Sequence, residues 1–224
     1  MRAAALRCCI RPMSAQDIAQ VLDIERASFP SMWPQTVYQR ELKNELARYL
    51  VAYEPAPEAD EVEDGPEESG VRALMRRILG VTPPSQRDRI LGLVGVWCMM
   101  GEAHIVTIAV RPELRRQGLG EVLLLAALEA AVETGQQEVT LEHRISNHAA
   151  RALYEKYGFA QVGVRARYYT DNQEDAVLMT TPQLQSRQYR RLLSERIAAQ
   201  RQHWGDDFPL DGLLPGLTGN PRFN

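Results

Sequence analysis

A glycine-rich segment at residues 115–120, with the sequence RRQGLG, lies between an apolar run that ends at Val110 and a second, longer apolar run. Glycines let the backbone approach a ligand closely, and the N-terminus of a following helix presents N–H groups and the positive end of its dipole. The two arginines add charge-assisted contacts to phosphate. The segment predicts a cradle for phosphate or pyrophosphate, although a bare Gly-x-Gly also fits a plain strand-to-helix turn.

Two nucleotide-binding motifs do not fit this segment. A P-loop requires Lys and then Ser or Thr after its last glycine, whereas Glu121 and Val122 follow Gly120. A dinucleotide-binding fingerprint requires a third small residue where Leu123 stands. The pattern that remains is Arg/Gln-x-x-Gly-x-Gly directly after a strand.

The elements around this segment alternate between strand-like and helix-like patterns. We expect strands at residues 8–11, 49–53, 139–142, 159–169 and 175–180, and two more within 91–110 that meet in a turn at 100–102. We expect one helix after Ser14, where Asp17 completes a capping-box start, and others at residues 35–44, 121–134, 147–157 and 183–204. This order predicts a layered domain of the α/β or α+β class.

Two parts of the chain lie outside this plan, so we expect one domain at residues 8–182, an insertion at 54–89 and an extension at 183–224. Residues 54–70 hold eight acidic residues, three prolines and no basic residue, a composition that predicts disorder. Residues 71–79 indicate a short amphipathic surface helix or, as the less favoured alternative, a basic docking helix for a partner or RNA. The extension combines a polar helix with a coil that could dock back on the domain.

Composition and charge exclude several classes of protein. The chain has 224 residues, 45% hydrophobic and 25% charged, and Lys+Arg 26 against Asp+Glu 29 gives a net charge of -3. This balance argues against a strongly basic nucleic-acid-binding surface, yet removing the eight acids of residues 54–70 leaves 21 acidic against 26 basic residues. Three cysteines favour a reducing compartment, no segment is apolar enough to span a membrane, and no Cys/His spacing indicates a metal. We therefore expect a cytoplasmic protein without a metal.

Three runs in the same order and at fixed separations resemble the GNAT superfamily of N-acetyltransferases. They are the loop at residues 115–120, the run LEHRISN at 141–147, and NHAARALYEKYGF at 147–159, which is similar to the closing-helix signature Asn-x-x-Ala-x-x-Leu-Tyr-x-x-x-Gly-Phe. The Leu-Glu-x-Arg-x-Ser-Asn run resembles the RimI type, the ribosomal-protein alanine N-acetyltransferases. So do Ile24-Glu25 with Phe29-Pro30 and Trp33, and Arg167-Tyr168-Tyr169 with Glu174-Asp175-Ala176.

The resemblance covers roughly residues 10–182 without the insertion, and it implies a GNAT fold with a mixed, mostly antiparallel sheet flanked by helices. It also implies direct acetyl transfer from acetyl-CoA to an amine. Position in the motif makes Glu142 the general base, through water, and Tyr154 the acid that protonates the leaving sulfur. A Glu with a reference pKa of about 4.3 is ionised at neutral pH, and a Tyr near 10 stays protonated.

The resemblance further assigns the cofactor contacts. Residues 108–110 would pair with the pantetheine arm, and the Val110 N–H would polarise the thioester oxygen. The full set of expected cofactor contacts is Ile108, Ala109, Val110, Arg115, Arg116, Gln117, Gly118, Leu119, Gly120, Glu121 and Asn147. Glu121 departs from the basic residue common in relatives, which is tolerable if it points to solvent. His143 stands where a small aliphatic residue is usual, and strand alternation directs it away from Glu142.

Acceptor recognition by this resemblance falls to two loops. Phe29 and Trp33 lie in the loop after the first helix, and Tyr168 and Tyr169 lie between the last strands. Plain loop packing is the alternative interpretation of each. Residues 31–32 lengthen the first loop relative to a shorter Phe-Pro-Trp form.

These observations predict an enzyme that acetylates protein N-termini, with the N-terminal alanine of a small-subunit ribosomal protein as the favoured acceptor. The alternatives are a GNAT enzyme for a small-molecule amine or a lysine, and a non-catalytic acyl-CoA-binding regulator. Retention of both Glu142 and Tyr154 argues against the regulator. We expect a monomer or a weak dimer that binds neither membranes nor a specific nucleic acid.

Overall fold

The computed structural model describes residues 7–29, 35–56, 88–210 and 213–218. Trp33, most of the acidic insertion and the expected helix at residues 71–79 lie outside the described residues.

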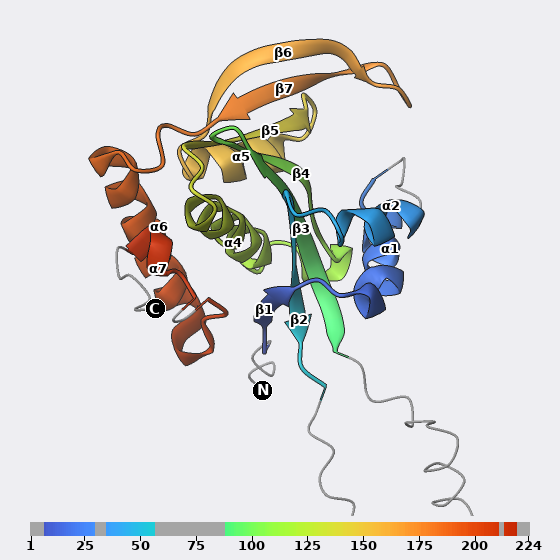
Figure 1. Ribbon diagram of the computed structural model, residues 1–224, viewed down its shortest axis with the longest axis horizontal. Helices are drawn as coiled ribbons and strands as arrows, with labels where there is room; N and C mark the ends of the chain where they lie inside the picture. Colours follow the sequence, from blue (N-terminus) through green and yellow to red (C-terminus); the bar gives the residue numbers. More distant parts are fainter. Residues whose placement is uncertain (1–6, 30–34, 57–87, 211–212, 219–224) are drawn as a thin grey trace, which may run out of the picture.

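A seven-stranded sheet forms the centre of the domain (Figure 1). Its strands lie in the order β1-β2-β3-β4-β5-β7-β6, and only the β4–β5 pair is parallel. The expected mixed, mostly antiparallel sheet is thereby confirmed. The strands are β1 (Cys9–Pro12), β2 (Ala47–Glu54), β3 (Arg89–Met99), β4 (Glu102–Val110), β5 (Glu138–Arg144), β6 (Ala160–Tyr169) and β7 (Glu174–Thr180).

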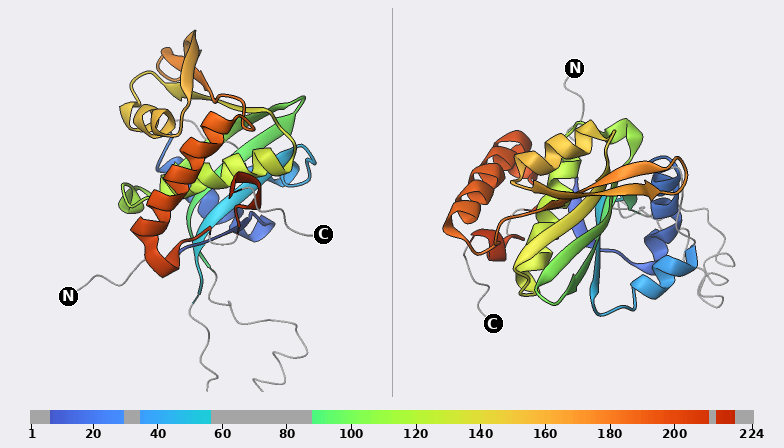
Figure 2. Two further views of the ribbon diagram at one scale, coloured as in Figure 1. Left: turned by 90° about the vertical axis from the view of Figure 1, so that its left-hand side faces the viewer. Right: turned by 90° about the horizontal axis from the view of Figure 1, so that it is seen from above.

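Helices cover both faces of this sheet, as the two further views show (Figure 2). The first face carries α1 (Ile18–Arg26) and α2 (Gln35–Glu41). The opposite face carries α4 (Leu119–Glu133), α5 (His148–Lys156), α6 (Arg187–Trp204) and α7 (Pro215–Thr218). Single turns of 3-10 helix lie at Ala15–Asp17, Pro112–Leu114 and Gly205–Asp207.

The start of α1 follows the expected capping box. The Asp17 carboxylate accepts a hydrogen bond from the Ser14 backbone N–H at 2.7 Å and pairs with Arg11 at 2.7 Å. Ile18, Val21 and Ile24 then bury the face that packs on the sheet. The helix expected at residues 121–134 begins earlier, at Leu119. Gly118 takes a left-handed conformation (φ 88°), so the chain turns sharply there and α4 starts at the next residue.

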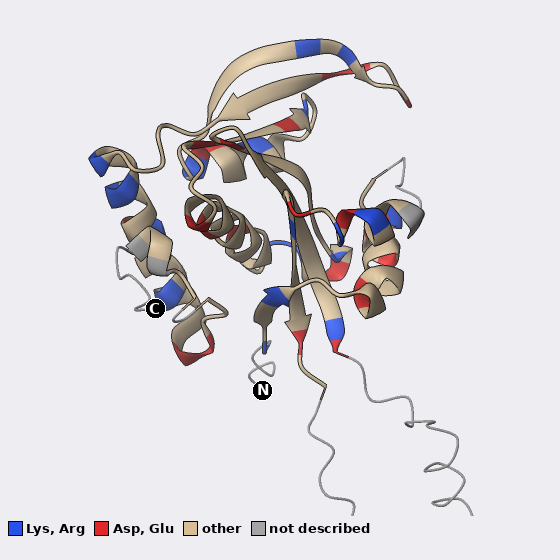
Figure 3. Ribbon diagram, viewed as in Figure 1, with Lys and Arg blue, Asp and Glu red and all other residues tan. Residues whose placement is uncertain are grey.

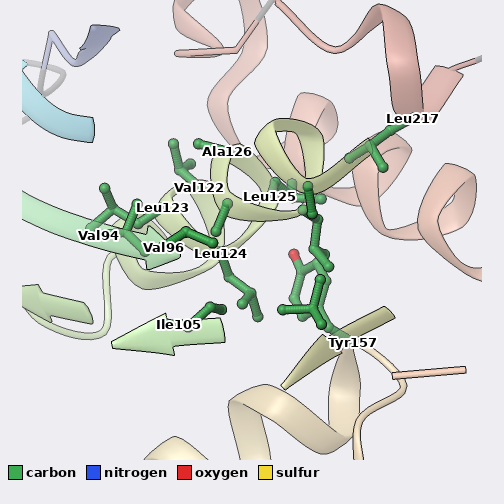
Figure 4. Packing of buried hydrophobic residues seen from close by; sticks show 14 of the residues in the cluster. Val94, Val96, Ile105, Val122, Leu123, Leu124, Leu125, Ala126, Tyr157 and Leu217 are labelled. Carbon is green, nitrogen blue, oxygen red and sulfur yellow. The ribbon is translucent and has the colours of Figure 1, made fainter. Parts of the chain in front are cut away.

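Helix α4 is apolar around its whole circumference because it is covered on two sides. Eleven of its 15 residues are buried. Side chains of α4 lie between Val94, Val96 and Ile105 of the sheet and Leu217 of α7 (Figure 4). A helix that is hydrophobic all round belongs in the centre of a fold rather than on its surface.

The C-terminal residues 183–210 and 213–218 supply that second cover. Leu193, Ile197 and Leu217 belong to the same buried cluster as α4. The buried Glu129 carboxylate accepts the backbone N–H groups of Gly216 at 2.6 Å and Leu217 at 2.8 Å, while burial raises its pKa. The expectation that the C-terminal coil docks back is confirmed, and part of that coil forms α7.

Candidate active site

Strands β4 and β5 separate halfway along their length, and this opening organises the site. Their parallel pairing begins at Glu102↔Glu138 and ends at Ile105↔Leu141. The register between β3 and β4 shifts at this point, from Val96↔Ile105 to Gly95↔Thr107, so Val106 is the extra residue of a β-bulge. A bulge bends its strand and increases the local twist, and the last residues of β4 therefore diverge from β5.

Beyond the bulge, β4 presents backbone groups to this opening. The Arg111 N–H donates to the Leu91 oxygen at 2.9 Å. Antiparallel pairs alternate between hydrogen-bonded and non-hydrogen-bonded residues, so Ala109 bonds toward β3 while Ile108 and Val110 direct their N–H and C=O groups away from β3. An extended ligand could add to this edge as another strand would.

The glycine-rich loop follows at the end of β4. Arg116 (φ 65°) and Gly118 (φ 88°) both take left-handed conformations, and the first turn of α4 leaves N–H groups without partners inside the helix. Arg115 donates to Ser28 Oγ at 2.9 Å and to the Val110 oxygen at 3.2 Å, which anchors the loop to β4 and to the end of α1. Arg116 and Gln117 are exposed, so Arg116 is the arginine with its side chain open to an incoming phosphate.

Glu121 does not point to solvent, the orientation under which its departure from a basic residue was tolerable. Its Oε2 accepts from Lys156 Nζ at 2.6 Å, Tyr157 Oη at 2.8 Å and Gln200 Nε2 at 2.7 Å. These donors belong to α5, its C-terminal end and α6. The carboxylate is thus committed to contacts that join α4, α5 and α6, and Lys156 compensates its negative charge.

Glu142 lies on β5 one residue past the end of the paired region, where the strands part. Its side chain is only 7% exposed and is held by two cations or potential cations, Arg165 Nη1 at 2.8 Å from Oε1 and His104 Nε2 at 3.0 Å from Oε2. His104 in turn contacts Thr140 Oγ1 through Nδ1 at 2.9 Å. Thr140 donates its hydroxyl proton to Glu102 at 2.6 Å.

His104 contacts the candidate base directly, and the sequence analysis did not place it in the site. The register pairs His104 with Thr140, and Glu142 follows two residues later on the same face of β5. Adjacent parallel strands could have suggested this proximity, but a register cannot be read from the sequence alone.

Tyr154 lies on the opposite side of β5. It is 4% exposed, and its ring packs against His143 and Phe159 with centroids 5.9 Å and 5.7 Å apart. Burial raises the pKa of the Tyr154 phenol, and the nearby Tyr169 raises it further. Among the described residues no hydrogen bond joins Tyr154 to Glu142, and alternation along β5 places the two on different faces. Glu142 and Tyr154 can therefore act on the same substrate only if it lies in the opening between β4 and β5.

Asn147 is the N-cap of α5, where its Oδ1 accepts the Ala150 N–H at 3.1 Å. This bond fixes the start of the helix that carries Tyr154. The segment before it is fixed from the other side, because Glu174 accepts the Ser146 N–H at 2.8 Å and pairs with Arg144 at 3.3 Å.

The expected acceptor residues fall in two places. Tyr168 and Tyr169 form an edge-to-face pair with ring centroids 5.3 Å apart, and Tyr168 is 45% exposed. The Arg144 guanidinium lies 3.9 Å from the Tyr169 ring centroid. Burial raises the pKa of Tyr169 to about 12. Phe29 is half-buried against the core beneath α1, so packing already explains its apolar ring.

Glu25, four residues before Phe29, carries a buried carboxylate. The sequence analysis cited this residue only as part of the resemblance. Glu25 is 3% exposed, and its Oε1 accepts the Tyr38 hydroxyl at 2.6 Å. Burial raises the pKa of Glu25. In addition to Glu142, the domain therefore has a buried carboxyl group, Glu25, on the face of the sheet that α1 covers.

A parted β4–β5 pair beside a glycine-rich loop and a helix with a buried tyrosine defines a class of enzyme. The family model of the GNAT acetyltransferases matches residues 18–159, and the chain belongs to this family. GNAT acetyltransferases use acetyl-CoA. The described residues fit this donor, because β4 has no strand partner beyond Ile105 on its β5 side and Arg116 is exposed in the loop before α4.

Particular relatives narrow the likeness to the RimI type. A Bacillus subtilis (strain 168) protein named "putative ribosomal protein bS18-alanine N-acetyltransferase" is 35% identical over 174 residues, covering 77% of this chain and 94% of the relative. The ribosomal protein bS18-alanine N-acetyltransferase of Escherichia coli (strain K12) is 43% identical over 100 residues, covering 44% and 68%. A crystal structure of the ribosomal-protein-S18-alanine N-acetyltransferase from Escherichia coli matches with a TM-score of 0.58, at 24% identity over 78% of this chain and 93% of that chain.

None of the helices within the described residues is long and apolar enough to cross a membrane. That part of the chain also holds no group of three or more His, Cys, Asp or Glu residues placed to bind a metal ion.

Proposed function

We propose that this enzyme transfers the acetyl group of acetyl-CoA to the N-terminal α-amine of a protein, with the N-terminal alanine of a small-subunit ribosomal protein as its acceptor. The observation that carries the proposal is the position of Glu142, held by His104 and Arg165 where β4 and β5 part. The names of the relatives from Bacillus subtilis and Escherichia coli support the choice of acceptor.

Acetyl-CoA supplies an activated acetyl thioester when it is bound. Ile108 and Val110 bind its pantetheine arm through the open edge of β4, and the Val110 N–H donates to the thioester oxygen as negative charge develops there. The loop at residues 115–120 and the first turn of α4 hold the pyrophosphate, with Arg116 as the charge-assisted donor. These groups lie on β4, in the loop and in the first turn of α4, and holding the two reactants in one orientation favours the reaction.

Glu142 removes a proton from the attacking amine, directly or through one water. A protonated amine is not a nucleophile, so this step is required at neutral pH. Tyr154 donates its phenolic proton to the sulfur that leaves. The raised pKa of Tyr154 keeps this proton in place until the thiolate develops, and the opening between the strands lets the two residues act from opposite faces.

Tyr168 and Tyr169 form the acceptor side of the site, where an exposed ring and a hydroxyl can hold a peptide backbone. The alternatives are transfer to a lysine or a small-molecule amine, and an acyl-CoA-binding regulator without turnover. A peptide panel separates them. The purified chain is incubated with acetyl-CoA and peptides that begin with Ala, Ser, Met or Gly, or with an N-blocked lysine peptide. Acetylation of the Ala peptide supports the proposal, whereas acetylation of lysine alone, or of no amine, contradicts it.

A further inference from the structure

The last turn of α6 lies directly against the glycine-rich loop. A Cβ placed at Gly118 would lie 3.2 Å from Trp204 Nε1 and 3.3 Å from His203 Cδ2 and Nε2. The Trp204 side chain is half-buried and His203 is exposed, and their rings meet edge to face with centroids 5.7 Å apart. Residues of the C-terminal extension, outside the 18–159 match to the family, therefore border the loop expected to hold pyrophosphate.

A chain of hydrogen bonds links the same turn of α6 to α4. Trp204 Nε1 donates to Gln200 Oε1 at 3.2 Å, and Gln200 Nε2 donates to Glu121 Oε2 at 2.7 Å. Gln200 is only 5% exposed, so this bond is made in a water-poor environment where an unpaired amide would be costly. Glu121 is the residue in the first turn of α4 that the resemblance marked as a departure, and here it bonds to α6.

The charge of α6 also suits a polyanionic ligand. Five arginines and one glutamate lie on this helix, and its basic residues are visible along its length in Figure 3. The basic residues are Arg187, Arg190, Arg191, Arg196 and Arg201. A cationic helix raises the local concentration of anions and favours the bound form of a ligand that carries phosphates.

We propose that the C-terminal extension forms one wall of the acetyl-CoA site. Trp204 and His203 contact the nucleotide end of the cofactor, the adenosine 3′,5′-bisphosphate moiety, and Gln200 positions the loop through Glu121. The adenosine follows the pyrophosphate in the cofactor, and Trp204 and His203 border the loop that holds the pyrophosphate. An indole that is partly exposed there can stack on a base. The inference rests on the proposed use of residues 115–121 as the pyrophosphate site and is independent of the acceptor.

Tryptophan fluorescence tests the contact without any acceptor present. The full chain and its Trp204→Phe variant are titrated with adenosine 3′,5′-bisphosphate, with 4′-phosphopantetheine and with acetyl-CoA. The emission that depends on Trp204 is expected to change with adenosine 3′,5′-bisphosphate and acetyl-CoA and to stay constant with 4′-phosphopantetheine. Emission changes that are identical in the two proteins, or a Trp204-dependent change caused by 4′-phosphopantetheine, would overturn the proposal.

Calorimetric affinities give a second readout with a matched control. Trp204→Ala is expected to raise the Kd of acetyl-CoA about tenfold, as loss of one base-stacking ring does, and Gln200→Leu to raise it by a smaller factor. Ser194→Ala, on an exposed part of α6 where the Ser194 hydroxyl donates to the Arg190 carbonyl oxygen, is expected to leave the Kd unchanged. Circular dichroism verifies that each variant is folded. A folded Trp204→Ala protein with the wild-type Kd contradicts the inference.

The outcome is separable from that of the proposed function. A chain that shows the Trp204-dependent binding but acetylates no protein N-terminus keeps this inference and loses the proposed function. A chain that acetylates an N-terminal alanine with no dependence of acetyl-CoA binding on Trp204 keeps the function and loses the inference.

Discussion

His104 Nε2 lies 3.0 Å from Glu142 Oε2, and His104 connects this carboxylate to two further polar side chains. His104 Nδ1 contacts Thr140 Oγ1 at 2.9 Å, and the Thr140 hydroxyl donates to Glu102 at 2.6 Å. Both ring nitrogens of His104 therefore contact side chains of β5. The expected general base begins a chain of polar contacts that alternates between β5 and β4.

Replacement of Glu142 by Gln tests its role as the base. The amide preserves the size of the side chain but cannot take a proton, so kcat should fall roughly 100- to 10,000-fold. The affinity for acetyl-CoA, measured by calorimetry, should stay within a factor of about two, because Glu142 lies on β5 and the cofactor-binding edge is on β4. Glu138→Gln, at the other end of the same strand, serves as the control and should retain the wild-type rate. A Glu142→Gln enzyme with the wild-type kcat would refute the assignment.

The pair can be examined by a double-mutant cycle. His104→Gln, Glu142→Gln and the double variant are compared by kcat/KM. The two single effects should sum to more than the effect of the double variant, with a coupling free energy of about 0.5–3 kcal/mol, because the side chains are in contact. Arg26→Gln, an exposed substitution on α1, should combine additively with Glu142→Gln. Strict additivity of His104→Gln and Glu142→Gln would mean that His104 has no part in the function of the base.

Removal of the Tyr154 hydroxyl tests the proposed acid. Tyr154→Phe keeps the buried ring and its contacts with His143 and Phe159, so the melting temperature should change little while kcat falls by about a hundredfold. Because burial raises the Tyr154 pKa above its ordinary value of 10.0, the wild-type rate should not decline from loss of this proton as the pH rises to 10. Tyr53→Phe, on β2, is the control. An unchanged kcat in Tyr154→Phe, or an alkaline loss of activity that this variant removes, would contradict the role.

The lowered pKa of Glu174 predicts that the segment around Ser146, next to the site, loses stability in acid. Hydrogen bonds from Ser146, Asn172 and Arg144 lower its pKa from 4.5 to about 2. The folded state therefore binds this proton more weakly than the unfolded state. Its stabilisation is fully present above pH 4.5 and is lost as the pH falls toward 2. Chemical denaturation at several pH values measures this dependence, which should be shallower in Glu174→Gln. Equal pH dependence in the two proteins would show that Glu174 does not stabilise the turn.

Much of the fold could be predicted because its signals are local. The turn between β3 and β4, the capping box at Ser14 and Asp17, and the glycine before α4 each depend on a few neighbouring residues. The mixed sheet followed from the resemblance of ordered motifs and is confirmed by the strand order. The start of α4 was predicted two residues late, because Leu119 and Gly120 were counted as loop.

The parts of the site that were missed depend on distant residues. His104 meets Glu142 only because β4 and β5 pair in one particular register. Glu121 has partners 35 to 79 residues away, on α5, at its end and on α6, so its orientation could not follow from its own helix. The predicted roles of Glu142, Tyr154 and the cofactor-contacting residues remain predictions. The structure shows which strands and helices carry these residues.

The preference between an N-terminal amine and a lysine can be measured on one peptide that carries both kinds of amine. A synthetic peptide with a free N-terminal alanine and an internal lysine is incubated with acetyl-CoA and the purified enzyme, and fragmentation by tandem mass spectrometry locates the added acetyl group. N-terminal acetyl transfer predicts that the acetyl group is on the alanine nitrogen and absent from the lysine, and that Glu142→Gln lowers the yield. Acetylation of the lysine with the N-terminal amine unmodified would contradict the proposed function.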